Sequence, residues 1–143
     1  MKILISAPYM IDDLDPFRPV FERAGLAIEL AEVQERLNEE ELMAYAGEVD
    51  GVICGDDMFT EKVLRATRPR LKVISKWGTG VDSIDRQAAE EMGIQVFNTP
   101  GAFTHPVADT VLGFVLSFAR EIHTSDRQMK SGDWNKLPAR ALN

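Results

Sequence analysis

The sequence predicts an α/β domain with a parallel sheet, and three observations support this fold class. Short runs rich in β-branched and aliphatic residues recur at an even pace, and they predict strands at 2–6, 27–31, 51–54, 72–76 and 95–98. Runs such as Ile3-Leu4-Ile5 are apolar throughout rather than alternating, which is typical of strands covered on both faces. One stretch of helical character separates each strand from the next, and right-handed crossovers then favour a flavodoxin-like, doubly wound, five-stranded parallel sheet.

Helical periodicity between the strands predicts four helices, at 17–24, 39–46, 61–67 and 83–92. Asn38 and Thr60 are candidate N-caps, because their side-chain oxygens can accept from the free N–H groups of a first turn. Gly93 is placed to end the last of these helices.

Composition narrows the class of protein. The chain has 143 residues, of which 45% are hydrophobic, enough for one good core. A net charge of -7 without any block of Lys or Arg argues against nucleic acid or an anionic membrane as partners. The single cysteine, Cys54, cannot form an internal disulfide, and no Cys/His spacing suggests a metal site. Without a signal-like or membrane-spanning run, we expect a cytoplasmic protein. Cys54 lies at the end of an apolar strand, so we expect it to be buried and unreactive.

The loop at 77–82 is the first candidate ligand site, because doubly wound sheets bind ligands beyond the carboxyl ends of their strands. Gly78 and Gly80 stand just before a predicted helix whose cap is Asp82 or Ser83. Backbone N–H groups there can converge on an anion, and a carboxylate would fit. The alternative is that the two glycines only form a tight strand-to-helix turn.

A long helix is expected after the break in regular structure at 98–101. Thr104 or His105, with Pro106 in the first turn, opens it, and it can run to about Met129. Its apolar residues cover a sector about 160° wide, broader than one contact requires, so a second neighbour is predicted. The sector contains Val107, Ala108, Val111, Leu112, Phe114, Val115, Phe118, Ala119 and Ile122.

The segment 71–109, LKVISKWGTGVDSIDRQAAEEMGIQVFNTPGAFTHPVAD, resembles part of the D-isomer-specific 2-hydroxyacid dehydrogenases of the phosphoglycerate-dehydrogenase type. Those read like LKVI-S-R-x-G-V-G-x-D-N-[IV]-D, then A-x-x-x-G-I-x-V-x-N-T-P and VAE. The likeness continues through Gly132-Asp133-Trp134, the family's G-x-W, and more weakly over the whole chain. It implies an oxidoreductase that acts on the CH-OH group of small D-2-hydroxy acids or 2-oxo acids with NAD or NADP.

The resemblance also implies site residues and a division of the chain. The amides of Thr79 and Gly80, with Gly78 in the same loop, match the group that holds the substrate carboxylate, and Lys76 matches a basic residue lining the pocket. Thr79 and Val107 match positions that touch the nicotinamide end of the cofactor. Residues 1–98 would form the substrate-binding domain, and 99–143 the hinge, crossover helix and arm leading to a Rossmann domain.

No residue is predicted to be catalytic. The family's G-x-G-x-x-G turn, its substrate-orienting Arg and its Glu–His pair lie downstream of the G-x-W segment, and neither His105 nor His123 matches the catalytic histidine. His105 is interpreted as a helix-start or hinge residue and His123 as a solvated one. We therefore expect the isolated chain to be truncated before the Rossmann domain, inactive, and without tight cofactor binding.

The loop after the third strand departs from the family. Relatives often have a basic V-R-S-x-T-like loop, whereas this chain has Ile53-Cys54-Gly55-Asp56-Asp57. Two carboxylates there would repel an anionic substrate tail, which predicts a small acid with an uncharged tail. Alternatively, Asp56 and Asp57 only cap the next helix.

Two other classes of function stay open. One is a stand-alone module that binds small carboxylates or a partner protein. The other is a phosphoreceiver-type signalling domain using Asp12, Asp13, Asp56 and Asp57, although no Lys ends the fifth strand. For assembly, the wide apolar sector of the 106–129 helix predicts a homodimer.

Overall fold

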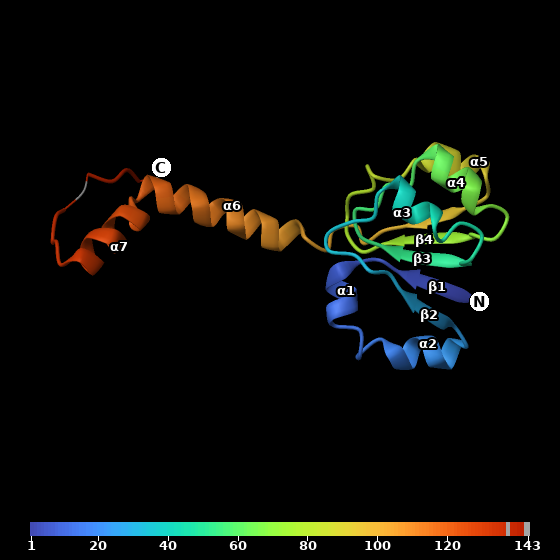
Figure 1. Ribbon diagram of the computed structural model, residues 1–143. Coiled ribbons are helices and arrows are strands. Elements are labelled where there is room, and N and C mark those ends of the chain that lie inside the picture. Colours follow the sequence, from blue (N-terminus) through green and yellow to red (C-terminus); the bar gives the residue numbers. More distant parts are fainter. Residues whose placement is uncertain (137, 142–143) are drawn as a thin grey trace. The chain divides into compact units, whose positions relative to one another are not determined.

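The computed structural model describes residues 1–136 and 138–141, and it divides into two compact units, Met1–Gly101 and Ala102–Asn143. Five parallel strands in the order β2-β1-β3-β4-β5 form the sheet of the first unit (Figure 1). The strands are β1 (Lys2–Ile5), β2 (Ala27–Leu30), β3 (Gly51–Cys54), β4 (Val73–Lys76) and β5 (Gln95–Phe97). This confirms the predicted sheet, with strand ends shifted by one residue at most.

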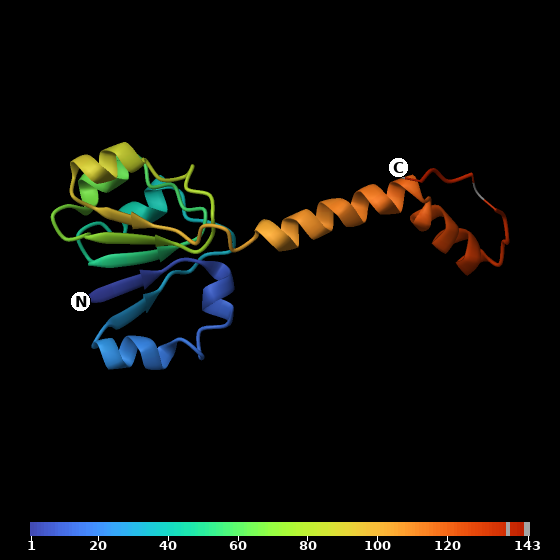
Figure 2. The same ribbon diagram turned by 180° about the vertical axis from the view of Figure 1, so that it is seen from behind.

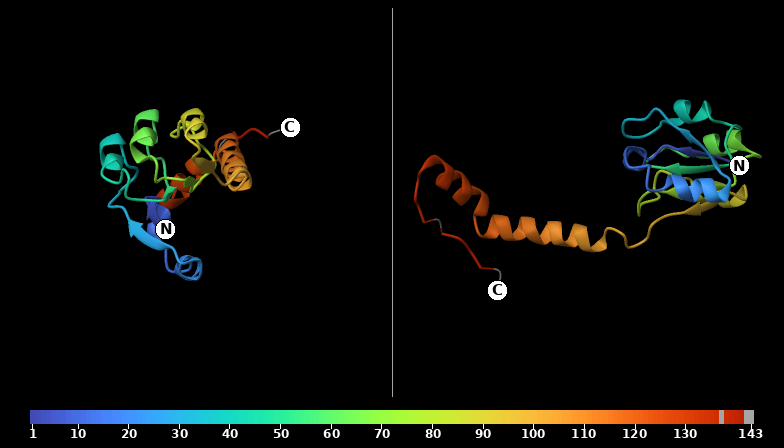
Figure 3. Two further views of the ribbon diagram at one scale, coloured as in Figure 1. Left: turned by 90° about the vertical axis from the view of Figure 1, so that its right-hand side faces the viewer. Right: turned by 90° about the horizontal axis from the view of Figure 1, so that it is seen from below.

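Helices cover both faces of the sheet, so the first unit is doubly wound. They are α1 (Pro8–Asp12), α2 (Arg18–Ala24), α3 (Glu39–Met43), α4 (Glu61–Thr67) and α5 (Arg86–Glu91). Helices α3, α4 and α5 lie on one face and α2 on the other (Figures 1 and 3). The strand arrows point to one edge, beside α1, and Figure 2 shows the same edge from behind. That edge is formed by the carboxyl ends of the strands.

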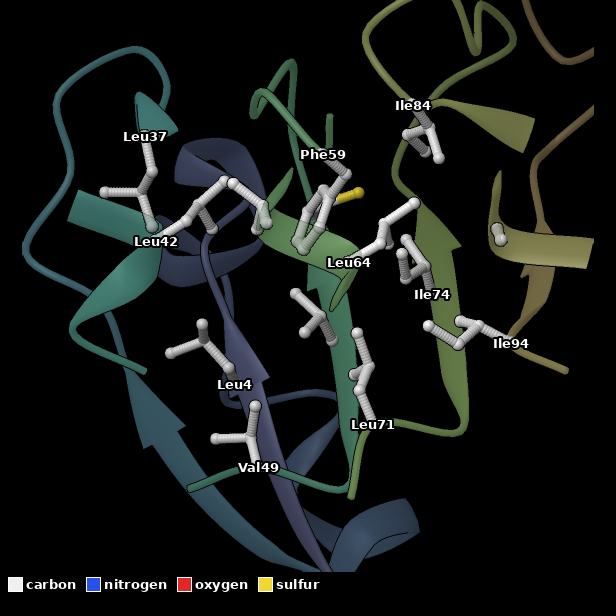
Figure 4. Packing of buried hydrophobic residues seen from close by; sticks show 14 of the residues in the cluster. Leu4, Leu37, Leu42, Val49, Phe59, Leu64, Leu71, Ile74, Ile84 and Ile94 are labelled. Carbon is white, nitrogen blue, oxygen red and sulfur yellow. The ribbon is translucent and has the colours of Figure 1, made fainter. Parts of the chain in front are cut away.

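The core consists of two layers on opposite sides of the sheet. Leu4 and Ile74 face α3, α4 and α5, where they pack with Phe59 and Leu64 (Figure 4). On the other side, the buried residues are Ile3, Ile5, Ala7, Met10, Leu14 and Phe21. Neighbouring β1 residues thus serve different layers, which explains why that strand is apolar throughout.

Three helices of the first unit differ from prediction. Helix α1 was not predicted, although Pro8 at its start is a regular helix-start signal. Helix α3 ends at Met43 rather than at residue 46. Helix α5 begins at Arg86 rather than at residue 83, because Asp82 and Ser83 form a turn and a parallel bridge holds Ile84 beside the buried Phe59. The Phe59 N–H donates to Ser83 O at 2.9 Å, and the Asp85 N–H donates to Phe59 O at 2.9 Å. Asp85, not Asp82 or Ser83, therefore caps α5.

The predicted caps have mixed outcomes. Asn38 is confirmed, because its side chain accepts from the N–H groups of Glu40 and Glu41 in a full capping box. Thr60 occupies the N-cap position of α4, but its hydroxyl donates to Glu39 at 2.6 Å and caps nothing. Gly93 follows the end of α5 with φ +72°, a left-handed conformation that favours glycine.

The second unit contains two helices where one long helix was predicted. Helix α6 (Thr104–Ala119) ends at Arg120, and α7 (Ile122–Ser131) begins after Glu121, whose φ is +53°. An edge-on contact between the rings of Phe118 and His123, 5.2 Å apart, spans the break. The sequence contains neither Pro nor Gly at 120–121, so periodicity alone predicted a continuous helix.

The apolar side chains of α6 are exposed in their own unit, and none of them is buried. The far end of the predicted arm, Leu137 and Leu142–Asn143, lies outside the described residues. Over the part of the chain that the structure describes, no helix is both long and apolar enough to span a membrane.

Candidate functional site

The glycine loop starts where β4 ends and runs as irregular backbone to Asp85. Because α5 begins only at Arg86, the amides of Thr79 and Gly80 are not at a helix N-terminus, and that part of the prediction is wrong. A helix dipole therefore does not contribute to anion binding here. Any binding depends on the N–H groups themselves.

The carbonyl groups of the loop are held by the segment that follows β5. The Gly78 carbonyl accepts from the Thr99 N–H at 2.9 Å, and the Thr79 carbonyl accepts from the Asn98 side-chain amide at 2.7 Å. The Thr79 hydroxyl donates to the Thr99 carbonyl at 3.2 Å. Three hydrogen bonds thus fix two successive peptide groups against residues 98–99.

The Thr79 and Gly80 N–H groups have no hydrogen-bond acceptor among the described residues, and both residues are exposed. The Gly78 N–H differs, because it donates to the Lys76 carbonyl at 2.9 Å. Two adjacent free donors on an exposed loop can bind one oxyanion. Thr79 and Gly80 will be called the amide pair.

Glycine occurs at positions 78 and 80 for different structural reasons. Gly78 has φ +152°, which favours glycine, whereas a Cβ there would make only an ordinary contact with Lys76 Cε, at 3.4 Å. At Gly80 no positive φ occurs, and a Cβ would meet only Asp82 Oδ2, at 3.7 Å. The fold does not itself require glycine at position 80, whose missing side chain leaves the surface beside its amide open.

Lys76 lies beneath this loop. Its side chain is 5% exposed, and its ammonium donates to the Gly55 carbonyl at 2.6 Å and to the Asp56 carboxylate. The ammonium is 3.9 Å from where a Cβ of Gly78 would be. Lys76 therefore places a positive charge under the loop, but Asp56 already balances it.

The carboxylates after β3 do not have their predicted roles. Asp57 caps no helix and does not face solvent, because it is fully buried, where it accepts from the Ser6 hydroxyl and, at 2.7 Å, from the Leu37 N–H. Burial raises the pKa of the Asp57 carboxyl above its ordinary value. Asp56 is mostly exposed and pairs with Lys76. Neither is a free negative charge placed to repel a substrate tail.

Other titratable groups near the loop offer no nucleophile. Cys54 is fully buried, as predicted, and burial followed by the nearby Asp57 charge raises the pKa of its thiol to about 12. Within residues 1–136 and 138–141, no three His, Cys, Asp or Glu side chains gather to hold a metal ion. Asp12 and Asp13 thus form no acidic pocket with Asp56 and Asp57 of the kind a phosphoreceiver needs.

The remaining predicted positions are divided between the units. Trp77 begins the glycine loop, is 37% exposed, and packs edge-on against Phe17 with ring centroids 5.7 Å apart. Val107 is 58% exposed on α6 of the second unit, and His105 and His123 are exposed there too. The structure gathers Lys76, Gly78, Thr79 and Gly80 in one place, whereas Val107 belongs to another unit.

Sequence reasoning missed two contributors to the loop, because it interpreted Asn98 and Thr99 only as a break and hinge. A usable signal existed, since β4 and β5 are consecutive parallel strands and the residues after their carboxyl ends must be neighbours. An Asn directly after β5 is then a natural donor to carbonyls of the glycine loop.

The chain is similar to known proteins over most of its length. The model of the D-isomer specific 2-hydroxyacid dehydrogenase catalytic domain matches residues 8–133. A hydroxypyruvate reductase of Thermotoga maritima is 39% identical over 109 residues, which are 76% of this chain and 35% of that protein. A D-3-phosphoglycerate dehydrogenase of Sus scrofa is 34% identical over 137 residues, which are 94% of this chain and 24% of that protein.

Solved structures show the same likeness. The NAD+-bound 3-phosphoglycerate dehydrogenase of Entamoeba histolytica superposes with a TM-score of 0.75 and 25% identity, over 99% of this chain and 43% of that one. The TT0316 protein of Thermus thermophilus gives a TM-score of 0.74 at 27% identity, over 96% of this chain and 43% of that one. The chain spans 24–43% of the length of these four proteins.

Proposed function

The chain belongs to the D-isomer specific 2-hydroxyacid dehydrogenase family, and on that premise we propose that it is the substrate-binding part of an oxidoreductase for small D-2-hydroxy acids or 2-oxo acids. The observation that carries the proposal is the amide pair, two exposed N–H groups without an acceptor among the described residues. They would bind the substrate carboxylate, and the Lys76 ammonium, paired with Asp56, would line the same pocket.

The proposal assigns binding but no proton transfer to this chain. His105 and His123 are exposed in the second unit, Cys54 is buried, and Asp57 is enclosed by hydrogen bonds. The chain alone is therefore expected to bind without turning over.

Only the nicotinamide end of the cofactor fits residues of this chain. Bound NAD or NADP would deliver or take up the hydride. The Thr79 hydroxyl donates a hydrogen bond to the Thr99 carbonyl, so its oxygen could still accept a hydrogen bond from the nicotinamide amide. The exposed side chain of Val107 would provide an apolar contact for the ring. The sequence contains no G-x-G-x-x-G turn for the pyrophosphate, so weak cofactor binding at most is expected.

We propose a substrate with an uncharged tail, for a different reason from the one the sequence suggested. Asp56 already pairs with Lys76, so no surplus positive charge is available for a second anionic group. 3-Phosphoglycerate should therefore bind no more tightly than glycolate, the smallest 2-hydroxy acid. Tight binding of 3-phosphoglycerate that weakens with salt would contradict this choice of substrate.

Fluorescence of Trp77 tests the proposed carboxylate site. In a Trp134→Phe background Trp77 is the only tryptophan, and it lies in the glycine loop. Titration with glycolate should change its emission to saturation, whereas neutral glycolamide, of the same shape, should not. Equal responses to both compounds, or none to either, would refute the proposed site.

A matched variant separates binding from folding. Gly80→Ala meets only ordinary contact at 3.7 Å, so thermal stability should stay within about 0.5 kcal/mol. The added methyl group crowds an oxygen that approaches the Gly80 N–H, and the glycolate response should weaken. Unchanged glycolate binding in this variant would place the carboxylate elsewhere.

A homodimer through α6 and a cytosolic location complete the proposal. The apolar residues of α6 are exposed in their own unit, and burying each large one is worth about 1.5–3 kcal/mol. Because the helix breaks at 120–121, α6 alone rather than the whole 106–129 segment is the proposed contact.

A stand-alone carboxylate-binding module is the second candidate function, and it would use the same amide pair.

A further inference from the structure

We propose that Asn98 is a positioning residue that orients the amide pair, an inference that rests on the proposed carboxylate site. Asn98 lies just past β5 and is exposed, and its side-chain amide donates to the Thr79 carbonyl at 2.7 Å. The next residue, Thr99, donates its N–H to the Gly78 carbonyl at 2.9 Å. Neither hydrogen bond would contact the proposed substrate carboxylate. Any effect of these bonds on carboxylate binding must therefore act through the two peptide groups that they hold.

Because peptide groups are planar, these two hydrogen bonds also fix the direction of the Thr79 and Gly80 N–H groups. In a planar trans peptide the carbonyl and the N–H point in opposite directions. The Thr79 N–H shares its peptide with the Gly78 carbonyl, and the Gly80 N–H shares its peptide with the Thr79 carbonyl. Because both carbonyls point toward residues 98–99, both N–H groups point away from that segment. The amide pair therefore offers two donors on one side, as an oxyanion requires.

Only one of the two anchors depends on a side chain. The bond from Thr99 is made by backbone and persists in any variant of that residue that keeps its N–H. The bond from Asn98 needs a side-chain donor of the correct length. Removing that donor would free the Thr79–Gly80 peptide to rotate, and the Gly80 N–H would lose its fixed direction. A preoriented donor binds an anion more tightly than one that must first be ordered.

Amide NMR of the full 143-residue chain tests the inference, with glycolate as the probe. In the wild-type chain the Thr79 and Gly80 amide signals should shift together and saturate. In Asn98→Ala and in Asn98→Leu, which keeps similar bulk without a donor, the Gly80 shift should shrink and affinity should fall about three- to tenfold. Gln95→Ala removes another exposed side-chain amide, from the start of β5, and should bind like wild type.

The outcomes distinguish the two proposals. If the wild-type amides do not respond to glycolate, the carboxylate site itself is wrong. If they respond and both Asn98 variants give the same Gly80 shift and affinity, the site stands and the positioning role of Asn98 is wrong. If Asn98→Leu alone binds like wild type, bulk rather than hydrogen bonding is the cause, and the inference also fails.

Discussion

At the scale of single residues, the buried ends of β1, β3 and β4 control the chemistry of this edge of the sheet. Ser6, Cys54, Asp57 and Lys76 are all buried there. The Ser6 hydroxyl donates to Asp57, and the Lys76 ammonium is held by Asp56 and the Gly55 carbonyl, which leaves main-chain N–H groups exposed in the loop above. We therefore expect this site to bind a ligand rather than to transfer a proton.

Cys54 should resist alkylation in the folded chain. With its thiol pKa raised to about 12, the thiolate fraction at pH 8 is about a thousandfold or more below that of an unperturbed cysteine, and burial blocks access as well. Iodoacetamide labelling followed by intact mass should show no adduct until urea unfolds the chain. Rapid labelling of the native chain would show that Cys54 is accessible.

Asp57 should make stability depend on pH in a defined direction. Burial raises its folded-state pKa, so the folded chain holds the proton more tightly than the unfolded chain does. Relative to Asp57→Asn, the wild-type free energy of unfolding should be greatest below the ordinary aspartate pKa of 3.8 and should fall as pH rises through the folded pKa. Urea unfolding of both proteins at several pH values measures this difference, and a difference that grows with pH would contradict the assignment.

Asp57→Ala should be more damaging than Asp57→Asn. Alanine removes the acceptor of the Leu37 N–H and leaves the Ser6 hydroxyl only the more distant Ile53 carbonyl, at 3.5 Å. The expected loss is about 1–3 kcal/mol in the free energy of unfolding, from the same urea experiment. Asparagine can still accept from Leu37, which makes it the matched control.

The hydrogen-bond partners of Asp56 and Asp57 could not be predicted from residue types alone. Asp56 and Asp57 are adjacent and identical in type, yet one is exposed and paired with Lys76 whereas the other is buried. The difference depends on which side of the β3–α4 loop each carboxylate faces, and contacts with distant residues such as Ser6 decide that. By contrast, the burial of Cys54 follows from its place in an apolar strand.

At the scale of elements, the strands and α4 were predicted closely, whereas the end of α3, the start of α5 and the break after α6 were not. Short runs rich in aliphatic and β-branched residues mark the strands, and all five lie within one residue of prediction. The start of α5 depends on a bridge between Phe59 and Ile84, residues far apart in sequence and invisible to local periodicity. The break between α6 and α7 has no Pro or Gly signal either.

Glu121→Gly distinguishes a broken helix from a continuous one. Glu121 has φ +53°, a conformation that costs a non-glycine residue about 1 kcal/mol, so glycine should preserve helical content. In a continuous helix the same change would cost about 1 kcal/mol and reduce helicity. Far-UV circular dichroism measures the result. Arg127→Gly, inside α7, is the control that should lower it.

At the scale of the whole molecule, the fixed order of short motifs from Leu71 to Asp109 was more informative than any single motif. Gly78 and Gly80 alone left the loop open to a purely structural interpretation. Their spacing from the Asn98-Thr99-Pro100 segment indicated the family, and the comparisons confirm it. Periodicity could not show that this same segment holds the loop carbonyls.

Assembly through α6 can be tested by placing a charge in the apolar sector. Val111→Glu, at the centre of that sector, should weaken a homodimer at least tenfold in sedimentation experiments, because a buried carboxylate must lose its water. Gly113→Glu adds the same charge to the opposite side of the helix, where a Cβ meets nothing within 4 Å, and should leave association unchanged. A wild-type chain that sediments as a monomer at tens of micromolar would exclude the dimer.

A crystal structure of the chain with bound glycolate would be the decisive test of the carboxylate site. We expect one carboxylate oxygen within about 2.7–3.2 Å of both the Thr79 and Gly80 nitrogens, while Asn98 keeps its bond to the Thr79 carbonyl. Glycolate bound away from this loop, or Thr79 and Gly80 amides donating to acceptors within their own chain, would contradict it.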